Sequence, residues 1–299
     1  MTTLQTSTPP VVRKPPVMRR RKVPLTRRIR VILVIAVLFA AAFLWFSPLL
    51  LLIFTGIRTS ADFLAHGALE LPREFTFDNF ARAWDVGNFA ATYRNSAIIT
   101  LIKVPLGVII TAMLAFALAM LRIRFRRTIM FTVFLGLTIP VYITILPLFI
   151  LVRQAGLADN VLGLVGPYLA FGIPFEVLVL QSFFQRVPKE IYEAARIDGA
   201  GNFRIFFQIV LPLSMPALVT VGILDAVATW NEFLMALVLL SSDENKTIPL
   251  GLLNFFGQFS RDSTGLAAGI LIAIVPMLIA YSLLQRYIVS GLTMGAVKG

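Results

Sequence analysis

Six long apolar stretches limit what this chain can fold into more than any other feature of its sequence. A bilayer core about 30 Å thick needs about 20 apolar residues of helix. The stretches that qualify are 31–57, 93–121, 128–152, 162–184, 213–240 and 264–289. Because unpaired backbone groups are costly in lipid, runs of this length predict helices. With 58% hydrophobic and 14% charged residues, we expect an all-α polytopic membrane protein with six transmembrane helices.

The basic residues are distributed unevenly between the loops that join these stretches. When loops alternate between the two sides, 19 of the 27 Lys and Arg residues fall on one side and seven on the other, and Lys103 lies inside a span. The positive-inside rule then places both termini and loop 185–212 in the cytoplasm, and the chain in the cytoplasmic membrane. A net charge of +12 also makes nucleic-acid binding an alternative, but the basic residues do not form a face interleaved with aromatic residues.

The longest polar interval of the C-terminal half, 187–212, predicts a helix, a glycine break and a second helix. Pro188 suits the first helical position, Glu193 lies near the positive end of the helix dipole, and Gly199 and Gly201 supply the stop.

The first of these helices has a narrow apolar face made by Ile191, Ala194 and Ala195. This face is too small to hold the helix on the chain's own core. A short helix with such a face, projecting from a membrane protein, suits a cleft on another protein.

The same interval resembles the cytoplasmic loop of ABC importer permease subunits (binding-protein-dependent transport inner membrane components). In that family E-A-A is followed by three residues, a glycine, nine residues and I-x-L-P. The residues that match, together with the neighbouring aspartate, are Glu193, Ala194, Ala195, Asp198, Gly199, Ile209, Leu211 and Pro212. The C-terminal run 291–299 is similar to the carbohydrate branch, and the resemblance covers roughly residues 93–299. An ordinary interfacial amphipathic helix is the alternative.

The resemblance implies a type I importer permease fold and a subunit that moves a sugar or a related polyol. It also implies the partners: a second permease subunit, cytoplasmic ATP-binding subunits that are coupled through the Glu193 loop, and an extracytoplasmic substrate-binding protein. An ion-gradient-driven secondary transporter is the alternative function, although no inverted repeat is recognisable.

The sequence lacks the usual components of a catalytic or metal site. His66 is the only histidine and there is no cysteine, so we expect no metal, no cofactor and no catalytic residue. No G-x-x-x-x-G-K phosphate loop occurs. If ATP drives this protein, another chain binds it.

Four ionisable residues lie inside the spans, where a charge costs at least about 2.5 kcal/mol: Lys103, Glu176, Asp225 and Glu232. Asp225, Thr229 and Glu232 are spaced to form one stripe of the fifth span. Counting residues from the span ends predicts an ion pair between Lys103 and Glu232, with Asp225 as the alternative partner. Glu176 has no obvious partner.

The run Trp230, Asn231 and Glu232 resembles the fifth span of carbohydrate permeases. An aromatic ring with an amide and a carboxylate could bind a sugar by stacking and hydrogen bonding. Together with Lys103 and Asp225, these residues form the candidate substrate path, and a charge pair that only fixes helix packing is the alternative reading.

The sequence also predicts the order of the segments. Residues 1–30 form a disordered basic tail, 31–57 the first span and 58–92 an external segment, which is either a cap or a docking surface for a binding protein. Residues 93–289 form the permease core and 290–299 a flexible cytoplasmic tail. Prolines in or near the spans predict kinks: Pro48, Pro105, Pro140, Pro147, Pro174, Pro216 and Pro276.

Overall fold

The computed structural model describes residues 25–256 and 262–296 of the 299-residue chain. Within those ranges the chain is helical and contains no strand, apart from one isolated bridge between Arg58 and Phe75. The elements are α1 (Leu25–Gly56), α2 (Ser60–His66), α3 (Asp78–Val86), α4 (Phe89–Met120), α5 (Arg126–Thr138), α6 (Val141–Gln154), η1 (Val161–Leu164), α7 (Val165–Phe184), α8 (Lys189–Ile197), α9 (Asn202–Ile205), the π-helical turn η2 (Phe206–Val210), α10 (Leu211–Leu213), α11 (Met215–Asn231), α12 (Leu234–Leu239), α13 (Ile248–Gly251), η3 (Leu252–Phe255) and α14 (Ser263–Ala296).

The chain divides into two units, Met1–Leu50 and Leu51–Gly299. The described part of the first unit is residues 25–50, which make up most of α1. This helix begins at Leu25, six residues before the predicted start of the first span. Near its end, Pro48 leaves the carbonyl of Leu44 without a helical donor. The Ser47 hydroxyl donates to that carbonyl at 2.9 Å. The predicted tail 1–30 is wrong over residues 25–30, and residues 1–24 lie outside the described residues.

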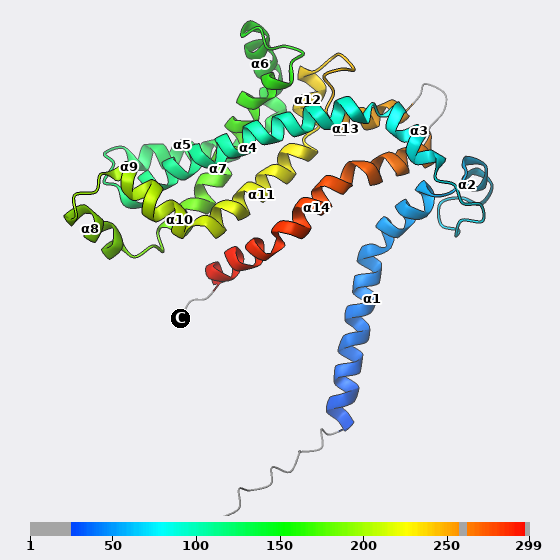
Figure 1. The fold of residues 1–299 in the computed structure, drawn as a ribbon, viewed down its shortest axis with the longest axis horizontal. Coiled ribbons are helices and arrows are strands. Elements are labelled where there is room, and N and C mark those ends of the chain that lie inside the picture. The colour runs from blue at the N-terminus through cyan, green and yellow to red at the C-terminus, as the bar shows by residue number, and fades with distance from the viewer. Residues whose placement is uncertain (1–24, 257–261, 297–299) are drawn as a thin grey trace, which may run out of the picture. The chain divides into compact units, whose positions relative to one another are not determined.

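In the second unit, α4 and α7 pack along each other, and α11 packs against both. α5 covers α7, and α14 packs against α11 and α3. Figure 1 shows α4, α11 and α14 running side by side, with α8 and α9 at one end of this unit and α2 and α3 at the other. The core is apolar, with Leu118, Val177, Leu180 and Phe184 fully buried.

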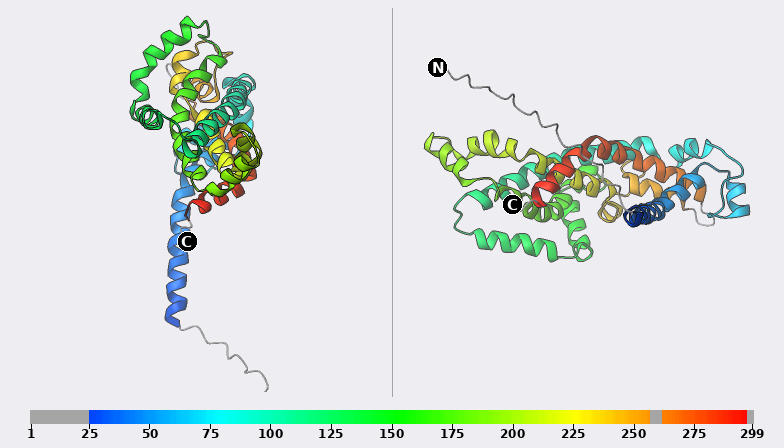
Figure 2. Two further views of the ribbon diagram at one scale, coloured as in Figure 1. Left: turned by 90° about the vertical axis from the view of Figure 1, so that its left-hand side faces the viewer. Right: turned by 90° about the horizontal axis from the view of Figure 1, so that it is seen from below.

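Among the described residues, four helices are long and apolar enough to cross a membrane, and up to six spans result if each of two bent pairs counts as one. The predicted third span is bent by 102° between α5 and α6, and Figure 2 shows α6 turned away from α5. The bend follows from Pro140, which precedes α6 in an extended conformation (φ −65°, ψ 131°) and cannot continue a helix. The other pair, 202–213 and α11, is bent by 78°.

Two predicted boundaries near the C-terminal half are wrong. The fifth span does not continue to residue 240, because Glu232 is extended (ψ 127°) and α11 ends at Asn231. The predicted tail 290–299 is not a separate segment: α14 continues as a helix to Ala296. Residues 297–299 lie outside the described residues.

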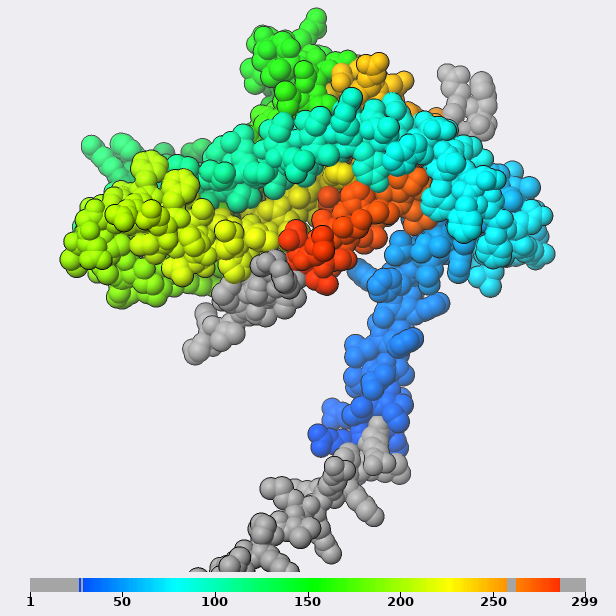
Figure 3. Space-filling model, in the orientation of Figure 1, coloured from blue at the N-terminus to red at the C-terminus, as the bar shows by residue number. Residues whose placement is uncertain are grey.

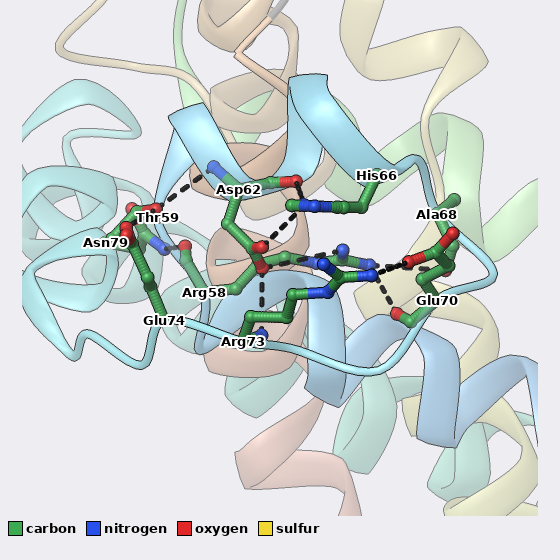
Figure 4. Close-up of polar contacts among 9 residues, drawn as sticks. All are labelled: Arg58, Thr59, Asp62, His66, Ala68, Glu70, Arg73, Glu74 and Asn79. Carbon is green, nitrogen blue, oxygen red and sulfur yellow. Dashed lines mark hydrogen bonds and ion pairs between the residues drawn. The ribbon is translucent and has the colours of Figure 1, made fainter.

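The segment between α1 and α4 is folded around the buried side chain of Arg58 (Figure 4). Its guanidinium group donates to the carbonyls of Ala68 and Glu70 at 3.3 and 3.2 Å and lies 3.9 Å from the carboxylate of Asp62. Burial opposes ionisation of Asp62, but hydrogen bonds from the Arg73 backbone and from His66 outweigh it and lower the pKa of the carboxyl group. This segment is therefore a structured cap at the end of α4.

Candidate functional site

The loop that carries the E-A-A sequence forms a helix that ends where the sequence predicted. Pro188 is the N-cap residue and α8 begins one residue later. At the other end Gly199 has φ +81°, a left-handed conformation that favours glycine. The Ala200 N–H donates to the Ala195 carbonyl at 2.9 Å and the Gly199 N–H to the Arg196 carbonyl at 3.1 Å. This pair of hydrogen bonds is a Schellman motif, which closes the helix C-terminus.

The predicted apolar face of α8 is split between the interior and the surface. Ala195 is buried in a core cluster that includes Phe184 and Phe206, whereas Glu193 and Ala194 are exposed. Ile197 is 86% exposed although it is apolar. The prediction that this face cannot hold the helix on its own core is wrong for Ala195, because neighbouring aromatic rings leave a space of its size. In the space-filling view the region of α8 and α9 forms one end of this unit (Figure 3).

Two side chains of α8 connect it to the helix that follows the glycine break. The Tyr192 hydroxyl and the Arg196 guanidinium both donate to Asn202 Oδ1 at 3.2 Å. Beyond Asn202 the chain forms α9, the π-turn η2 and α10. The remaining matched residues lie here or at the end of α8: Asp198 caps α8, Ile209 and Leu211 pack against the same core cluster, and Pro212 is exposed.

Inside the bundle, Lys103 of α4 is paired with two carboxylates. Its Nζ atom forms an ion pair with Asp225 of α11 and lies 3.5 Å from Oε1 of Glu176 on α7. The Thr111 hydroxyl donates to Glu176 Oε2 at 2.8 Å. The predicted pair with Glu232 is therefore wrong, the alternative partner Asp225 is the one found, and Glu176 has a partner after all.

Glu232 lies elsewhere, because the helix ends one residue before it. Its carboxylate accepts the backbone N–H groups of Met235 at 2.8 Å and Ala236 at 3.1 Å, so it caps the N-terminus of α12. It also accepts the hydroxyl of Tyr168 at 2.6 Å. The predicted stripe with Asp225 and Thr229 does not extend to Glu232.

Trp230 and Asn231 occupy different environments. The Trp230 side chain is buried, and its indole N–H donates to the Ala273 carbonyl of α14 at 3.3 Å. Its ring contacts that of Tyr93 edge to face, with 6.0 Å between centroids. Asn231 is exposed and donates to the Val227 carbonyl at 2.9 Å. Of the candidate path residues, Asn231 alone combines exposure with a polar side chain that bonds only to its own helix.

Sequence reasoning missed Glu176, Thr111 and Tyr168 as partners of the intramembrane charges. A signal for Glu176 was present in the glycines. Gly107 follows Lys103 by four residues and Gly172 precedes Glu176 by four, so each lies on the same helix face as the charge and leaves room beside it. Within the described ranges, no three His, Asp or Glu side chains form a group suited to a metal ion.

Comparison with known proteins gives consistent matches. Residues 103–294 match the family described as "Binding-protein-dependent transport system inner membrane component". The chain is 34% identical to the arabinooligosaccharides transport system permease protein of Halalkalibacterium halodurans, over 86% of this chain and 93% of that protein. It is 32% identical to a diacetylchitobiose uptake system permease protein of Streptomyces coelicolor, over 84% and 83%. A chain of a bacterial ABC transporter involved in alginate import superposes with a TM-score of 0.74 at 25% identity, over 89% of this chain and 99% of that one.

Proposed function

This chain belongs to the family of binding-protein-dependent transport system inner membrane components and is a permease subunit of an ABC importer, and we propose from that premise that it moves a sugar or a related polyol. The class of cargo is inferred from the relatives, which are named for arabinooligosaccharides, diacetylchitobiose and alginate.

The observation that carries the coupling mechanism is the exposed surface of α8. Glu193, Ala194 and Ile197 are presented outward on a helix that the Schellman motif closes and that Ala195 anchors to the core. A helix that is held to the core and exposes an apolar and acidic surface transmits a conformational change of a bound partner better than a flexible loop would. We assign this surface to the contact with a separate ATPase, so the chain itself hydrolyses no ATP.

The orientation follows from the same assignment. We place the α8 end in the cytoplasm, which agrees with the excess of basic residues in the loops on that side. The cap formed by α2 and α3 then lies outside, where it would meet the substrate-binding protein that the family description names. A second permease chain would complete the path. Of the candidate path residues, we assign Asn231 to cargo contact, because internal hydrogen bonds or ion pairs occupy Lys103, Asp225, Trp230 and Glu232.

Uptake of labelled sugars by cells that lack the gene tests this proposal. We expect the wild-type gene to restore uptake of at least one mono- or oligosaccharide, and Glu193→Lys and Ala194→Leu to abolish it while the protein still accumulates in the membrane. Ala195→Leu is the matched comparison: it overfills the chain's own core and should reduce accumulation instead.

The ion-gradient alternative makes the opposite prediction in the same assay. ABC-driven uptake persists when an ionophore collapses the ion gradients while ATP is maintained. Uptake that stops with the ionophore and is indifferent to Glu193→Lys would contradict the proposal.

A further inference from the structure

Lys103, Glu176 and Asp225 come from three different helices and meet at one point inside the bundle. A Cβ atom placed on Gly172 would lie 2.7 Å from Lys103 Nζ, 2.9 Å from Glu176 Oε1 and 3.5 Å from Asp225 Oδ1. The three residues are only 1%, 2% and 7% exposed. Because this chain encloses them by itself, a partner subunit or a lipid headgroup cannot reach them, and their charges must be balanced by groups within the chain.

The charges of these three residues do not balance. Lys103 supplies one positive charge, whereas two ionised carboxylates supply two negative ones, and the Thr111 hydroxyl that binds Glu176 is neutral. Asp225 Oδ2 is buried and has no hydrogen-bond partner. An uncompensated charge and an unpaired oxygen are both costly away from water.

Among the residues that the structure describes, the helices packed around the cluster bring no further cation to it. In the described part of the chain, α13 and α14 carry no charged side chain as far as Gln285, and the titratable Tyr281 of α14 is exposed. The charged residues of α5, which covers α7, are Arg126 and Arg127 at its exposed first turn. The two carboxyl groups do share a space, because Glu176 Oε2 and Asp225 Oδ2 both lie 3.6 Å from the Cβ position of Gly107.

We propose that this cluster binds one proton, shared between Glu176 and Asp225. With that proton one carboxylate balances the ammonium group of Lys103, and the other group is a neutral acid that can donate a hydrogen bond where Asp225 Oδ2 otherwise has none. A metal ion does not fit, since the ammonium group repels it and the six or more oxygen ligands that Ca²⁺ or Mg²⁺ prefers are absent from the cluster.

The bound proton makes the packing of α4, α7 and α11 depend on the charge state of the cluster. While the three helices are together, the low-dielectric interior prevents both carboxyl groups from ionising at once. If the helices separate, water reaches the carboxyl groups and the proton leaves at neutral pH. This proposal does not depend on the cargo or on the direction of transport.

Infrared spectroscopy of the purified full-length chain at pH 7 tests the proposal. Exposed Asp and Glu side chains are ionised at this pH, so the C=O stretch of a carboxylic acid reports a buried proton. We expect the intensity of one carboxylic acid per chain, and its loss in Glu176→Gln and in Asp225→Asn, because each variant leaves one carboxylate to balance Lys103. Glu190→Gln, at an exposed position of α8, should leave the band unchanged.

Loss of the band in at least one of the two cluster variants supports the proposal. Absence of the band from the wild-type protein, or its retention in both variants, overturns it. If a variant does not accumulate, the wild-type chain is sufficient: unfolding in sodium dodecyl sulfate at the same pH should remove the band, and a band that survives unfolding overturns the proposal.

Discussion

The hydroxyl of Tyr93 donates a hydrogen bond to the backbone carbonyl of Ile272, the carbonyl that Pro276 leaves without a donor in α14. Proline has no N–H, so the residue four positions earlier loses its helical partner. Tyr93 lies on α4, and the hydrogen bond therefore joins the two helices at the position where α14 is interrupted. A backbone carbonyl that a proline leaves unpaired in one transmembrane helix therefore accepts a hydrogen bond from a side chain of another helix.

Tyr93→Phe should destabilise the protein by about 1–3 kcal/mol, because it leaves the partly buried Ile272 carbonyl without a partner. Pro276→Ala restores the helical N–H, so the cost of Tyr93→Phe should largely disappear in the Pro276→Ala background. Thermal unfolding of the four proteins in detergent measures this coupling. Tyr142→Phe, at a residue that is 74% exposed, serves as the control. Equal costs in both backgrounds would show that the hydrogen bond is not made to the vacated carbonyl.

Gly199→Ala should disturb the E-A-A loop without affecting the core. A Cβ atom at this position meets nothing within 4 Å, so the cost arises only from φ +81° and is about 1–2 kcal/mol. The correctly closed α8 should then be about 5–30 times less populated. Trypsin cleavage at the exposed Arg196 and Arg204 should accelerate while ATP-driven uptake falls.

Gly201→Ala is the matched control for this prediction. Gly201 also has open space around its Cβ position, but its φ is −74°, which any residue adopts. Equal cleavage rates in the two variants would count against the left-handed cap as the reason for glycine at position 199.

Gly172→Ala should disrupt the charge cluster by sterics alone. Its methyl group would lie 2.7 Å from Lys103 Nζ and 2.9 Å from Glu176 Oε1, and overpacking of this kind costs about 1–3 kcal/mol. Gly166→Ala on the same helix meets nothing within 4 Å and should be neutral or stabilising by up to about 1 kcal/mol. Thermal unfolding distinguishes the two, and similar midpoints would mean that the cluster has more room than its geometry indicates.

Asp159→Asn should lower the free energy of unfolding by the contribution that the ionised Asp159 carboxylate makes, and this contribution disappears in acid. The backbone N–H groups of Ser242 and Ser241 donate to Asp159 Oδ1 at 3.0 and 2.8 Å and lower the pKa of its carboxyl group below the ordinary 3.8. A carboxyl group whose pKa is lower in the folded than in the unfolded protein stabilises the fold. This stabilisation is complete at a pH above the unfolded-state pKa and is lost as the pH falls through the folded-state pKa. The difference in unfolding midpoint between wild type and variant should therefore be largest above about pH 5 and vanish under stronger acid. A difference that grows on acidification would contradict this.

Local signals predicted the helices and the E-A-A loop well, and long-range pairings poorly. Gly199 predicts the end of α8, because the left-handed conformation that closes the helix is a local requirement. Pro140 indicates a helix break that the continuous apolar pattern does not show. No proline or glycine marks the end of α11 at Asn231, so Glu232 was placed on the wrong element. The choice of Asp225 and Glu176 as partners of Lys103 depends on how three helices pack, which spacing within each helix does not define.

Affinity purification of the tagged chain in mild detergent, followed by an ATPase assay, shows whether the exposed surface of α8 joins this permease to an ATPase. We expect the wild-type chain to co-purify with an ATP-hydrolysing protein, and Glu193→Lys to lose both the partner and the activity. A wild-type chain that purifies without such a partner, or a Glu193→Lys chain that retains partner and activity unchanged, would contradict it.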